Sequence, residues 1–219
     1  MNAWRTDAVF DPIRVPLDRW FADAISWLTL NYRPAFQAMK VPIEVILDGV
    51  AAVLAWVPPV AFIAIVAALA WRWAGWRVAA FSVAAFTLIG MVGLWRLTMV
   101  TLSMVTASVL VCLVIGLPLG VLAARSDTFR GLLRPVLDVM QTTPAFVYLV
   151  PVVMLFSIGT VAGVIATIIF ALPPLIRLTD LGIRQVPGDV VEAAEAFGSS
   201  EREILFKVRL PLALPTIMA

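Results

Sequence analysis

The sequence predicts an all-α, polytopic transmembrane protein, and three observations lead to that prediction. Of its 219 residues, 62% are apolar and only 14% are charged, which is about half the charged fraction of a typical soluble domain. The mean hydropathy is +1.01. Several apolar runs approach the roughly 20 residues that a helix needs to cross a bilayer. A soluble chain of this size could not cover its surface with so few charges.

Composition also excludes several classes of function. The net charge of +2 is too small for a nucleic-acid-binding face. Histidine, the commonest metal ligand and general base, is absent. The single cysteine, Cys112, lies in an apolar run and offers neither a disulfide nor a thiolate metal site. No phosphate-binding loop motif occurs, so we expect no ATP hydrolysis by this chain. We therefore expect no catalytic residue, metal, cofactor or nucleic acid partner.

The chain divides into an N-terminal segment, residues 1–44, and a membrane domain, residues 45–219. In the N-terminal segment, apolar residues recur at helical spacing, which predicts an amphipathic helix. These residues are Leu17, Trp20, Phe21, Ala24, Trp27 and Leu28. Because tryptophan prefers the headgroup region, we expect this helix to lie in the membrane interface, in contact with lipid. Packing against a partner subunit is the alternative.

Five apolar segments of the membrane domain are predicted to be spans. They are residues 50–71, 78–95, 97–124, 135–157 and 161–176, and a further span begins near residue 210. Pro58 and Pro59 predict a kink in the first span. The fourth and fifth spans are separated by residues 158–160 and form a tight hairpin. Pro173 and Pro174 predict the end of the fifth span.

The arginines set the predicted orientation. Arg72 and Arg77 follow the first span, whereas Arg125, Arg130 and Arg134 follow the third. Because arginine-rich loops stay in the cytoplasm, the N-terminal segment is predicted to lie outside and the loop 177–209 inside.

Two carboxylates near the spans are interpreted as solvated or paired groups. Asp48 lies at the mouth of the first span, where water can reach it. Asp138 follows Arg134 at helical (i, i+4) spacing, which predicts an ion pair at the cytoplasmic edge. A proton relay through either residue is the disfavoured alternative.

The polar loop 177–209 is predicted to form two short helices joined at a glycine. Asp189 is the expected N-cap of the first, with Glu192 three residues later. That helix runs to Phe197 and ends at Gly198. Ser199 or Ser200 then caps a second helix over residues 201–206. Its apolar side chains, Ile204, Leu205 and Phe206, are expected to contact another protein.

This loop resembles the EAA signature of the membrane subunits of bacterial ABC importers. The matching residues are Glu192-Ala193-Ala194, Gly198 and Val208-Arg209-Leu210-Pro211, with valine in place of the usual isoleucine. The resemblance implies a type I ABC-importer permease fold in the bacterial inner membrane and a coupling loop that inserts into a cleft of the ATPase subunit. The expected coupling residues are Glu192, Ala193, Ala194, Phe197, Gly198, Ile204, Leu210 and Pro211.

Two further stretches, residues 140–151 and 170–179, resemble the glycine betaine/proline betaine branch of these permeases. The resemblance covers roughly half the chain. It implies import of betaine-type osmoprotectants, two cytoplasmic ATPase subunits, a second permease chain that forms a homodimer, and an extracytoplasmic substrate-binding protein. Because Ala219 lies only a few residues into the span that Leu210 and Pro211 should open, we expect a C-terminally truncated chain.

The substrate path is the least determined part of the prediction. A quaternary ammonium cation is recognised by aromatic faces, and the fourth span contains both aromatic and polar residues. The candidates are Gln141, Thr142, Thr143, Phe146, Tyr148 and Phe156. Packing between spans is the alternative for each, and selectivity can reside in the binding protein. Alternative functions are an importer for an amino acid such as methionine, an ion-gradient-driven carrier, and a membrane scaffold without transport activity.

Overall fold

A computed structural model describes residues 17–219, and these residues form helices and turns without a strand. The predicted all-α fold class is confirmed. Residues 1–16 of the N-terminal segment, and the side chains of Leu17 and Phe21, lie outside the described part. The helices are α2 (Leu17–Trp56), α3 (Pro59–Ala74), α4 (Trp76–Met91), α5 (Trp95–Arg125), α6 (Asp127–Thr142), α7 (Ala145–Phe156), α8 (Thr160–Arg184), α9 (Gly188–Ala196), α10 (Glu201–Glu203), the π-helix η2 (Ile204–Arg209) and α11 (Leu210–Ile217).

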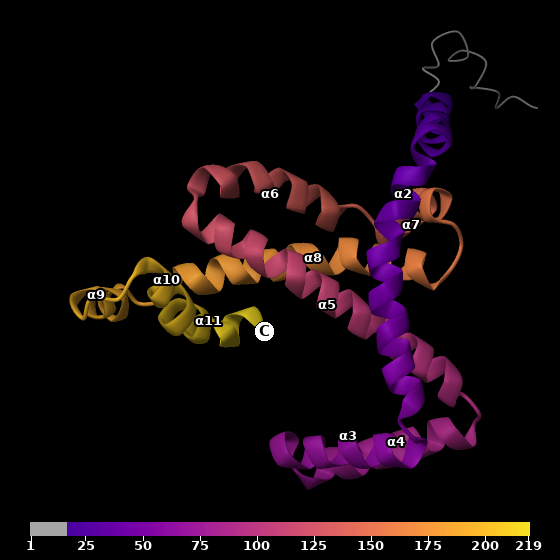
Figure 1. Cartoon of the computed structure of the whole chain (residues 1–219), viewed down its shortest axis with the longest axis horizontal. Helices are drawn as coiled ribbons and strands as arrows, with labels where there is room; N and C mark the ends of the chain where they lie inside the picture. Colours follow the sequence, from indigo (N-terminus) through magenta and orange to yellow (C-terminus); the bar gives the residue numbers. More distant parts are fainter. Residues whose placement is uncertain (1–16) are drawn as a thin grey trace, which may run out of the picture.

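The centre of the fold is the pair α5 and α8, which run in the same direction and cross at close range (Figure 1). Among the described residues, these two helices are long and apolar enough to cross a membrane individually, and two bent helix pairs bring the total to as many as four crossings. Val164 and Ile176 of α8 are completely or almost completely buried. This pair therefore forms the core against which the other helices pack.

Glycines on α5 allow the close approach of α8. A Cβ atom on Gly120 would lie 2.4 Å from the Cβ of Thr179 and 3.0 Å from the carbonyl oxygen of Ile176. A Cβ atom on Gly116 would lie 2.7 Å from a methyl group of Leu175. Two glycines four residues apart lie on one helix face, which is the usual device for close helix contact in membranes.

The N-terminal part of the chain differs from the prediction. A short interfacial helix followed by a span at 50–71 was expected, but α2 is a single helix of 40 residues that continues through Pro34 and Pro42. The chain then turns by 100° into α3. The turn occurs at Pro58-Pro59, because Pro59 has no N–H to donate and Pro58 disfavours helical geometry at the residue before it. Consequently α2 lies across the α5–α8 pair rather than along it (Figure 1).

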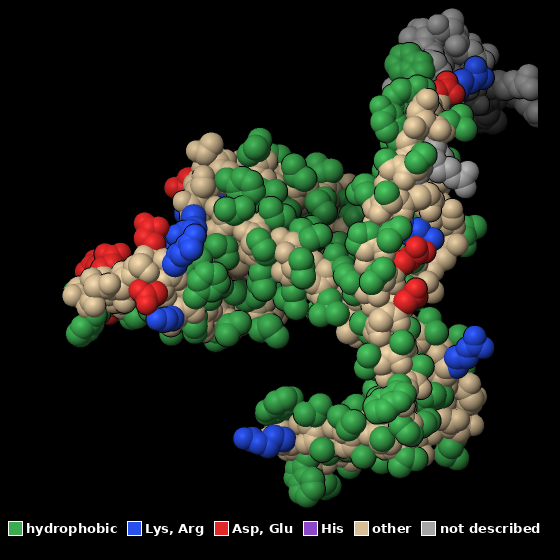
Figure 2. All heavy atoms as spheres, viewed as in Figure 1, with side chains coloured by type: hydrophobic (Ala, Val, Ile, Leu, Met, Phe, Trp, Pro, Cys, Tyr) green, Lys and Arg blue, Asp and Glu red, His purple; other side chains and the backbone are tan. Residues whose placement is uncertain are grey.

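Helices α3 and α4 form a hairpin beside this body. Phe62 of α3, Phe86 of α4 and Trp95 of α5 form an edge-to-face cluster with ring centroids 5.3 to 6.4 Å apart. The hairpin turns at Gly75, which is flanked by Arg72 and Arg77. Figure 2 shows basic side chains at this tip, and the tip points the same way as the C-terminal ends of α5 and α8.

The predicted fourth span, 135–157, is also two helices. The chain bends by 99° between α6 and α7, with Pro144 as the N-cap of α7. The hydroxyl of Tyr148 lies 2.8 Å from the carbonyl oxygen of Met140, which has no helical N–H partner because residue 144 is a proline. By contrast, α8, which corresponds to the predicted fifth span, continues through Pro173 and Pro174. It ends at Arg184, eight residues after the predicted end at Ile176. Neighbouring helices compensate for prolines inside such a helix.

Candidate functional site

The segment that follows α8 projects from the body as a bent pair of helices, which we call the elbow (residues 188–209). It lies at the far end of α8 from α2 (Figure 1). Helix α9 begins at Gly188 with Pro187 as its N-cap, so the prediction of Asp189 as the N-cap is wrong. The fixed φ of proline is already suited to starting a helix, and the helix begins earlier for that reason. The Asp189 carboxylate accepts a hydrogen bond from the backbone N–H of Val190, at 2.9 Å.

Helix α9 ends at a glycine, as the sequence indicates. Gly198 has φ +80°, a left-handed conformation that residues other than glycine rarely adopt. Its N–H donates to the carbonyl oxygen of Glu195 at 2.8 Å, and the N–H of Ser199 donates to that of Ala194 at 3.1 Å. These two bonds form a Schellman motif, which fixes the direction in which the chain leaves the helix.

The second arm of the elbow begins with a capping box. The Ser200 side chain accepts from the N–H of Glu203 at 3.4 Å, and the Ser200 N–H donates to the Glu203 carboxylate at 3.1 Å. Lys207 donates to the same carboxylate at 2.8 Å. The hydrogen bond from Lys207, followed by those from Ser200, lowers the pKa of Glu203 to about 2. A lowered folded-state pKa stabilises the elbow above the unfolded pKa, which is near 4.5, and that contribution is lost as the pH falls towards 2.

Removal of the Ser200 hydroxyl tests the capping box. We expect Ser200→Ala to cost about 1 kcal/mol of local stability, and therefore to speed amide exchange in residues 203–209 about fivefold. Hydrogen exchange measured by mass spectrometry checks this. Ser199→Ala is the control, because Ser199 precedes the box. Equal exchange rates in the two variants would contradict a capping role for Ser200.

The elbow has an inner and an outer face. Val191, Ile204 and Leu205 are buried, with exposed fractions of 9%, 4% and 7%, whereas Phe197 is 91% exposed and Phe206 is 65% exposed. Leu205 forms a buried cluster with Ile183 of α8 and with α11, and Ile204 is also buried, so in this structure neither side chain lies on the outer face. In η2 the helix widens to a π-helix, a feature found often at functional sites.

The other predicted coupling residues lie on or near the outer face. Glu192 and Ala193 are exposed, whereas Ala194 is half-buried. Leu210 is half-buried and Pro211 is exposed where α11 begins. Acidic side chains gather at this end of the molecule in Figure 2. The outer surface is thus an apolar tip, Phe197, beside an acidic helix.

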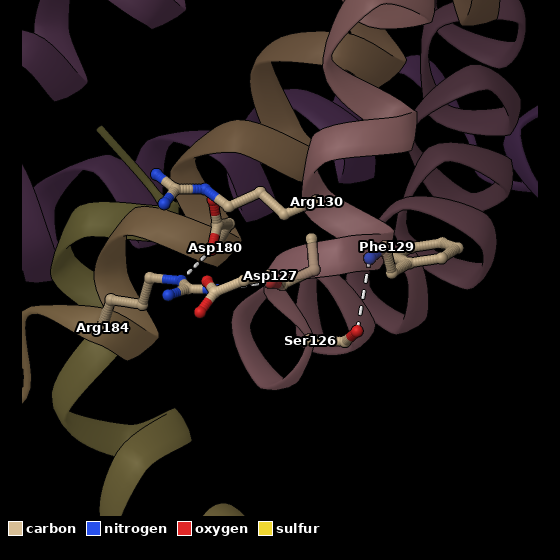
Figure 3. A network of polar contacts seen from close by, with 7 residues as sticks. Ser126, Asp127, Phe129, Arg130, Asp180 and Arg184 are labelled. Carbon is tan, nitrogen blue, oxygen red and sulfur yellow. Dashed lines mark hydrogen bonds and ion pairs between the residues drawn. The ribbon is translucent and has the colours of Figure 1, made fainter.

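A polar cluster joins the start of α6 to the C-terminal end of α8, just before the elbow, and sequence reasoning missed it. We call it the joint, and it comprises Asp127, Arg130, Asp180 and Arg184 (Figure 3). Arg184, the last residue of α8, contacts Asp180 through Nε at 2.7 Å and Asp127 of α6 through Nη2 at 2.7 Å. The (i, i+4) spacing of Asp180 and Arg184 was the available signal. Nearby, Asp138 pairs with Arg177 of α8 and not with Arg134 as predicted, because α6 turns this face towards α8.

The predicted substrate-path residues do not share one surface. Phe156 is 8% exposed and packs edge-to-face on Phe36 of α2, whereas Phe146 is 82% exposed. The hydroxyls of Thr142 and Thr143 donate to backbone carbonyl oxygens one turn earlier. The Tyr148 hydroxyl donates a hydrogen bond to the backbone of α6, next to the bend before α7. Gln141 is exposed. In this conformation Phe156 belongs to the core.

The chain is similar to known membrane transport proteins. A family model described as binding-protein-dependent transport system inner membrane component matches residues 116–219, which include the joint and the elbow. The chain is 50% identical over 214 residues to the glycine betaine/proline betaine transport system permease protein ProW of Escherichia coli strain K12, covering 96% of this chain and 60% of that protein. It is 43% identical over 206 residues to the glycine betaine transport system permease protein OpuAB of Bacillus subtilis strain 168, covering 94% of this chain and 73% of that protein.

A third relative matches a shorter region. The glycine betaine/carnitine transport permease protein GbuB of Listeria monocytogenes serotype 1/2a strain 10403S is 56% identical over 110 residues, covering 50% of this chain and 39% of that protein. The chain spans about three fifths of the length of ProW.

The apolar helices and the projecting elbow define a helical membrane protein with a polar segment that extends beyond α8. The chain belongs to the family of binding-protein-dependent transport system inner membrane components. The predicted family resemblance is confirmed.

Proposed function

We propose that this chain is the membrane permease subunit of an ATP-driven ABC importer for glycine betaine/proline betaine-type osmoprotectants. The observation that carries the proposal is its 50% identity, across 96% of its length, to a glycine betaine/proline betaine permease. The three relatives described above are all named for glycine betaine transport. The substrates are therefore quaternary ammonium compounds, and ATP is hydrolysed by a separate subunit.

The elbow is the proposed contact with the ATPase. Its exposed Phe197 and the acidic face of α9, including Glu192, suit a cleft that has an apolar hollow beside basic side chains. Buried Leu205 packs with Ile183 of α8 and with α11, and α9 packs against η2, so that movement of the cleft moves the permease. ATP binding closes the ATPase pair and favours the outward-open permease, and hydrolysis restores the inward-open state. This is a population shift driven by differential binding of nucleotide to the two states.

The proposed topology follows from the direction of the helices. The tip of the α3–α4 hairpin, with Arg72 and Arg77, points the same way as the elbow (Figure 1). The arginine pattern assigns both to the cytoplasm. Helix α2 then lies along the outer surface, where Trp20 and Trp27, 59% and 57% exposed, suit the headgroup region.

The remaining partners are two ATPase subunits, an extracytoplasmic binding protein and a second permease chain. Twofold symmetry is the commonest arrangement of like subunits, and a homodimer gives one elbow to each ATPase. The substrate path would run along the exposed surface of α6 and α7. There Phe146 is available to contact a quaternary ammonium group, and Gln141 lies nearby on the exposed end of α6.

Substrate competition tests the proposed chemistry. We expect uptake of labelled glycine betaine by the assembled importer to be reduced by unlabelled proline betaine and to be unaffected by methionine. The readout is the initial rate in vesicles that contain the permease, its ATPase and its binding protein. Inhibition by methionine together with indifference to proline betaine would reassign the importer to an amino acid.

A further inference from the structure

Arg184 joins three helices at the point where the elbow begins. It is the last residue of α8, and α9 starts four residues later at Gly188. Its guanidinium contacts Asp180 of its own helix at 2.7 Å, Asp127 of α6 at 2.7 Å, and the carbonyl oxygen of Ala123 in the last turn of α5 at 2.8 Å. Figure 3 shows Asp127 of α6 reaching towards Arg184 and Asp180, which both lie on α8. The ends of α5, α6 and α8 are therefore held together by one side chain.

Asp180 completes the joint from the inside. It is 6% exposed, and its second carboxylate oxygen lies 2.7 Å from Nε of Arg130 on α6, an ion pair in which the N–H is not aimed at the oxygen. Separation of a buried carboxylate from its arginine partners is costly, because it leaves an uncompensated charge, and here Arg130 and Arg184 share the Asp180 carboxylate. Helix α6 is thus tied to the end of α8 through Arg130 and through Asp127, in addition to the Asp138–Arg177 pair further along the two helices.

The ion pair that connects the elbow itself with the bundle is exposed to solvent. Arg125 of α5 pairs with Glu201 of α10 at 3.0 Å, but the Glu201 side chain is 90% exposed. Exposed pairs of this kind contribute little. Among the described residues, the joint is the buried ionic connection closest to α9.

We propose that Arg184 and Asp180 are the positioning residues that make α5, α6 and α8 follow the elbow as one rigid unit during the transport cycle. This inference rests on the proposed function, in which the ATPase moves the elbow. It adds the route by which that motion reaches α6, whose last turn precedes the bend at Pro144. Without the joint, α8 would follow α9 through the backbone while α6 lagged behind.

The first test separates ATP hydrolysis from transport. In vesicles that contain the assembled importer, we expect Arg184→Met to leave ATPase activity within about twofold of the unsubstituted value and to lower betaine uptake per ATP about tenfold. Arg184→Lys keeps the charge but cannot reach three partners. Its uptake per ATP should therefore lie between the values for the unsubstituted protein and for Arg184→Met. Lys40→Gln is the control, because it breaks an ion pair within a single helix, between Lys40 and Glu44 of α2. An equal fall in hydrolysis and uptake, or no fall in either, would overturn the inference.

The second test does not depend on the substrate. Gly131 on α6 and Gly188 at the start of α9 have open space around the position of a Cβ atom, so each accepts a spin label in a variant that lacks Cys112. With the joint intact, we expect the distance between the labels to stay constant when the complex is trapped with ATP and vanadate. With Arg184→Met, the distance should change or its distribution should broaden on trapping. A constant distance in both proteins would overturn the inference.

Asp127→Asn provides an independent test of the joint if the Arg184→Met variant misfolds. The Asp127 side chain is 84% exposed, so its substitution removes the link to α6 without leaving a buried charge. We expect a smaller loss of uptake per ATP, in the same direction, and no loss would count against the joint. Failure of the unsubstituted permease to bind the ATPase would instead refute the proposed function, and co-purification shows that separately.

Discussion

Gly198→Arg is expected to abolish docking of the ATPase while leaving the permease in the membrane. Gly198 has φ +80°, and a non-glycine residue held in the left-handed region costs about 1–2 kcal/mol. The two hydrogen bonds that close the end of α9 depend on this conformation. The arginine would also project beside Phe197, at the exposed tip. The substitution therefore strains the backbone at the end of α9 and also obstructs the exposed surface around Phe197.

Co-purification of the ATPase with the permease from solubilised membranes measures this effect. We expect no ATPase to be recovered with Gly198→Arg, and partial recovery with Gly198→Ala, which adds strain without bulk. Gly131→Arg is the matched control, because Gly131 lies on α6 with open space around it and without a positive φ. Undiminished recovery of the ATPase with Gly198→Arg would refute the docking role of the elbow.

Gly120→Leu is expected to separate α5 from α8 and to destabilise the whole permease. The first side-chain atom would already lie 2.4 Å from the Cβ of Thr179 and 3.0 Å from a backbone oxygen. Insertion of atoms into a packed core costs about 1–3 kcal/mol, and sometimes more. Here the obstacle includes backbone, which cannot rotate away, so we expect a cost at or above the upper end of that range.

Cys112 reports on the separation. It is the only cysteine of the sequence, is 4% exposed and lies on α5 within the same core. In detergent, Cys112 of the unsubstituted protein should react slowly with a maleimide, and Gly120→Leu should react much faster. The control is Gly90→Leu in α4, where a Cβ atom meets nothing within 4 Å. Equal labelling rates in the two variants would show that close packing at Gly120 is unimportant.

The effect of each proline on the helices is the part of the fold that the sequence did not predict. The ranges expected for the second and third spans lie within a few residues of α4 and α5. Pro58-Pro59 and Pro144, however, produce bends of 100° and 99°, whereas α8 passes straight through Pro173 and Pro174. The difference depends on what satisfies the freed carbonyl groups, such as the hydroxyl of Tyr148. Those partners are known only once the chain has folded.

The elbow was largely predictable because its signals are local. The glycine end of α9 at Gly198 and the cap at Ser200, one of the two serines expected, each act within a few residues and are found in the structure, although the pairing of Ser200 with Glu203 was not predicted. The inward orientation of Leu205 depends on contacts with Ile183 of α8 and with α11, which no local pattern contains. The joint was not predicted from the sequence for the same reason. Its Asp180–Arg184 spacing is visible in the sequence, but Asp127 and Arg130 reach it from a helix some 50 residues away.

Uptake of labelled glycine betaine at high external osmolarity tests the proposed function most directly. The permease is expressed with its ATPase and binding protein in cells that lack other osmolyte importers, and each component is omitted in turn. We predict uptake that requires all three components and that disappears with Gly198→Arg. Uptake that persists without the ATPase would contradict the account and would favour a carrier driven by an ion gradient.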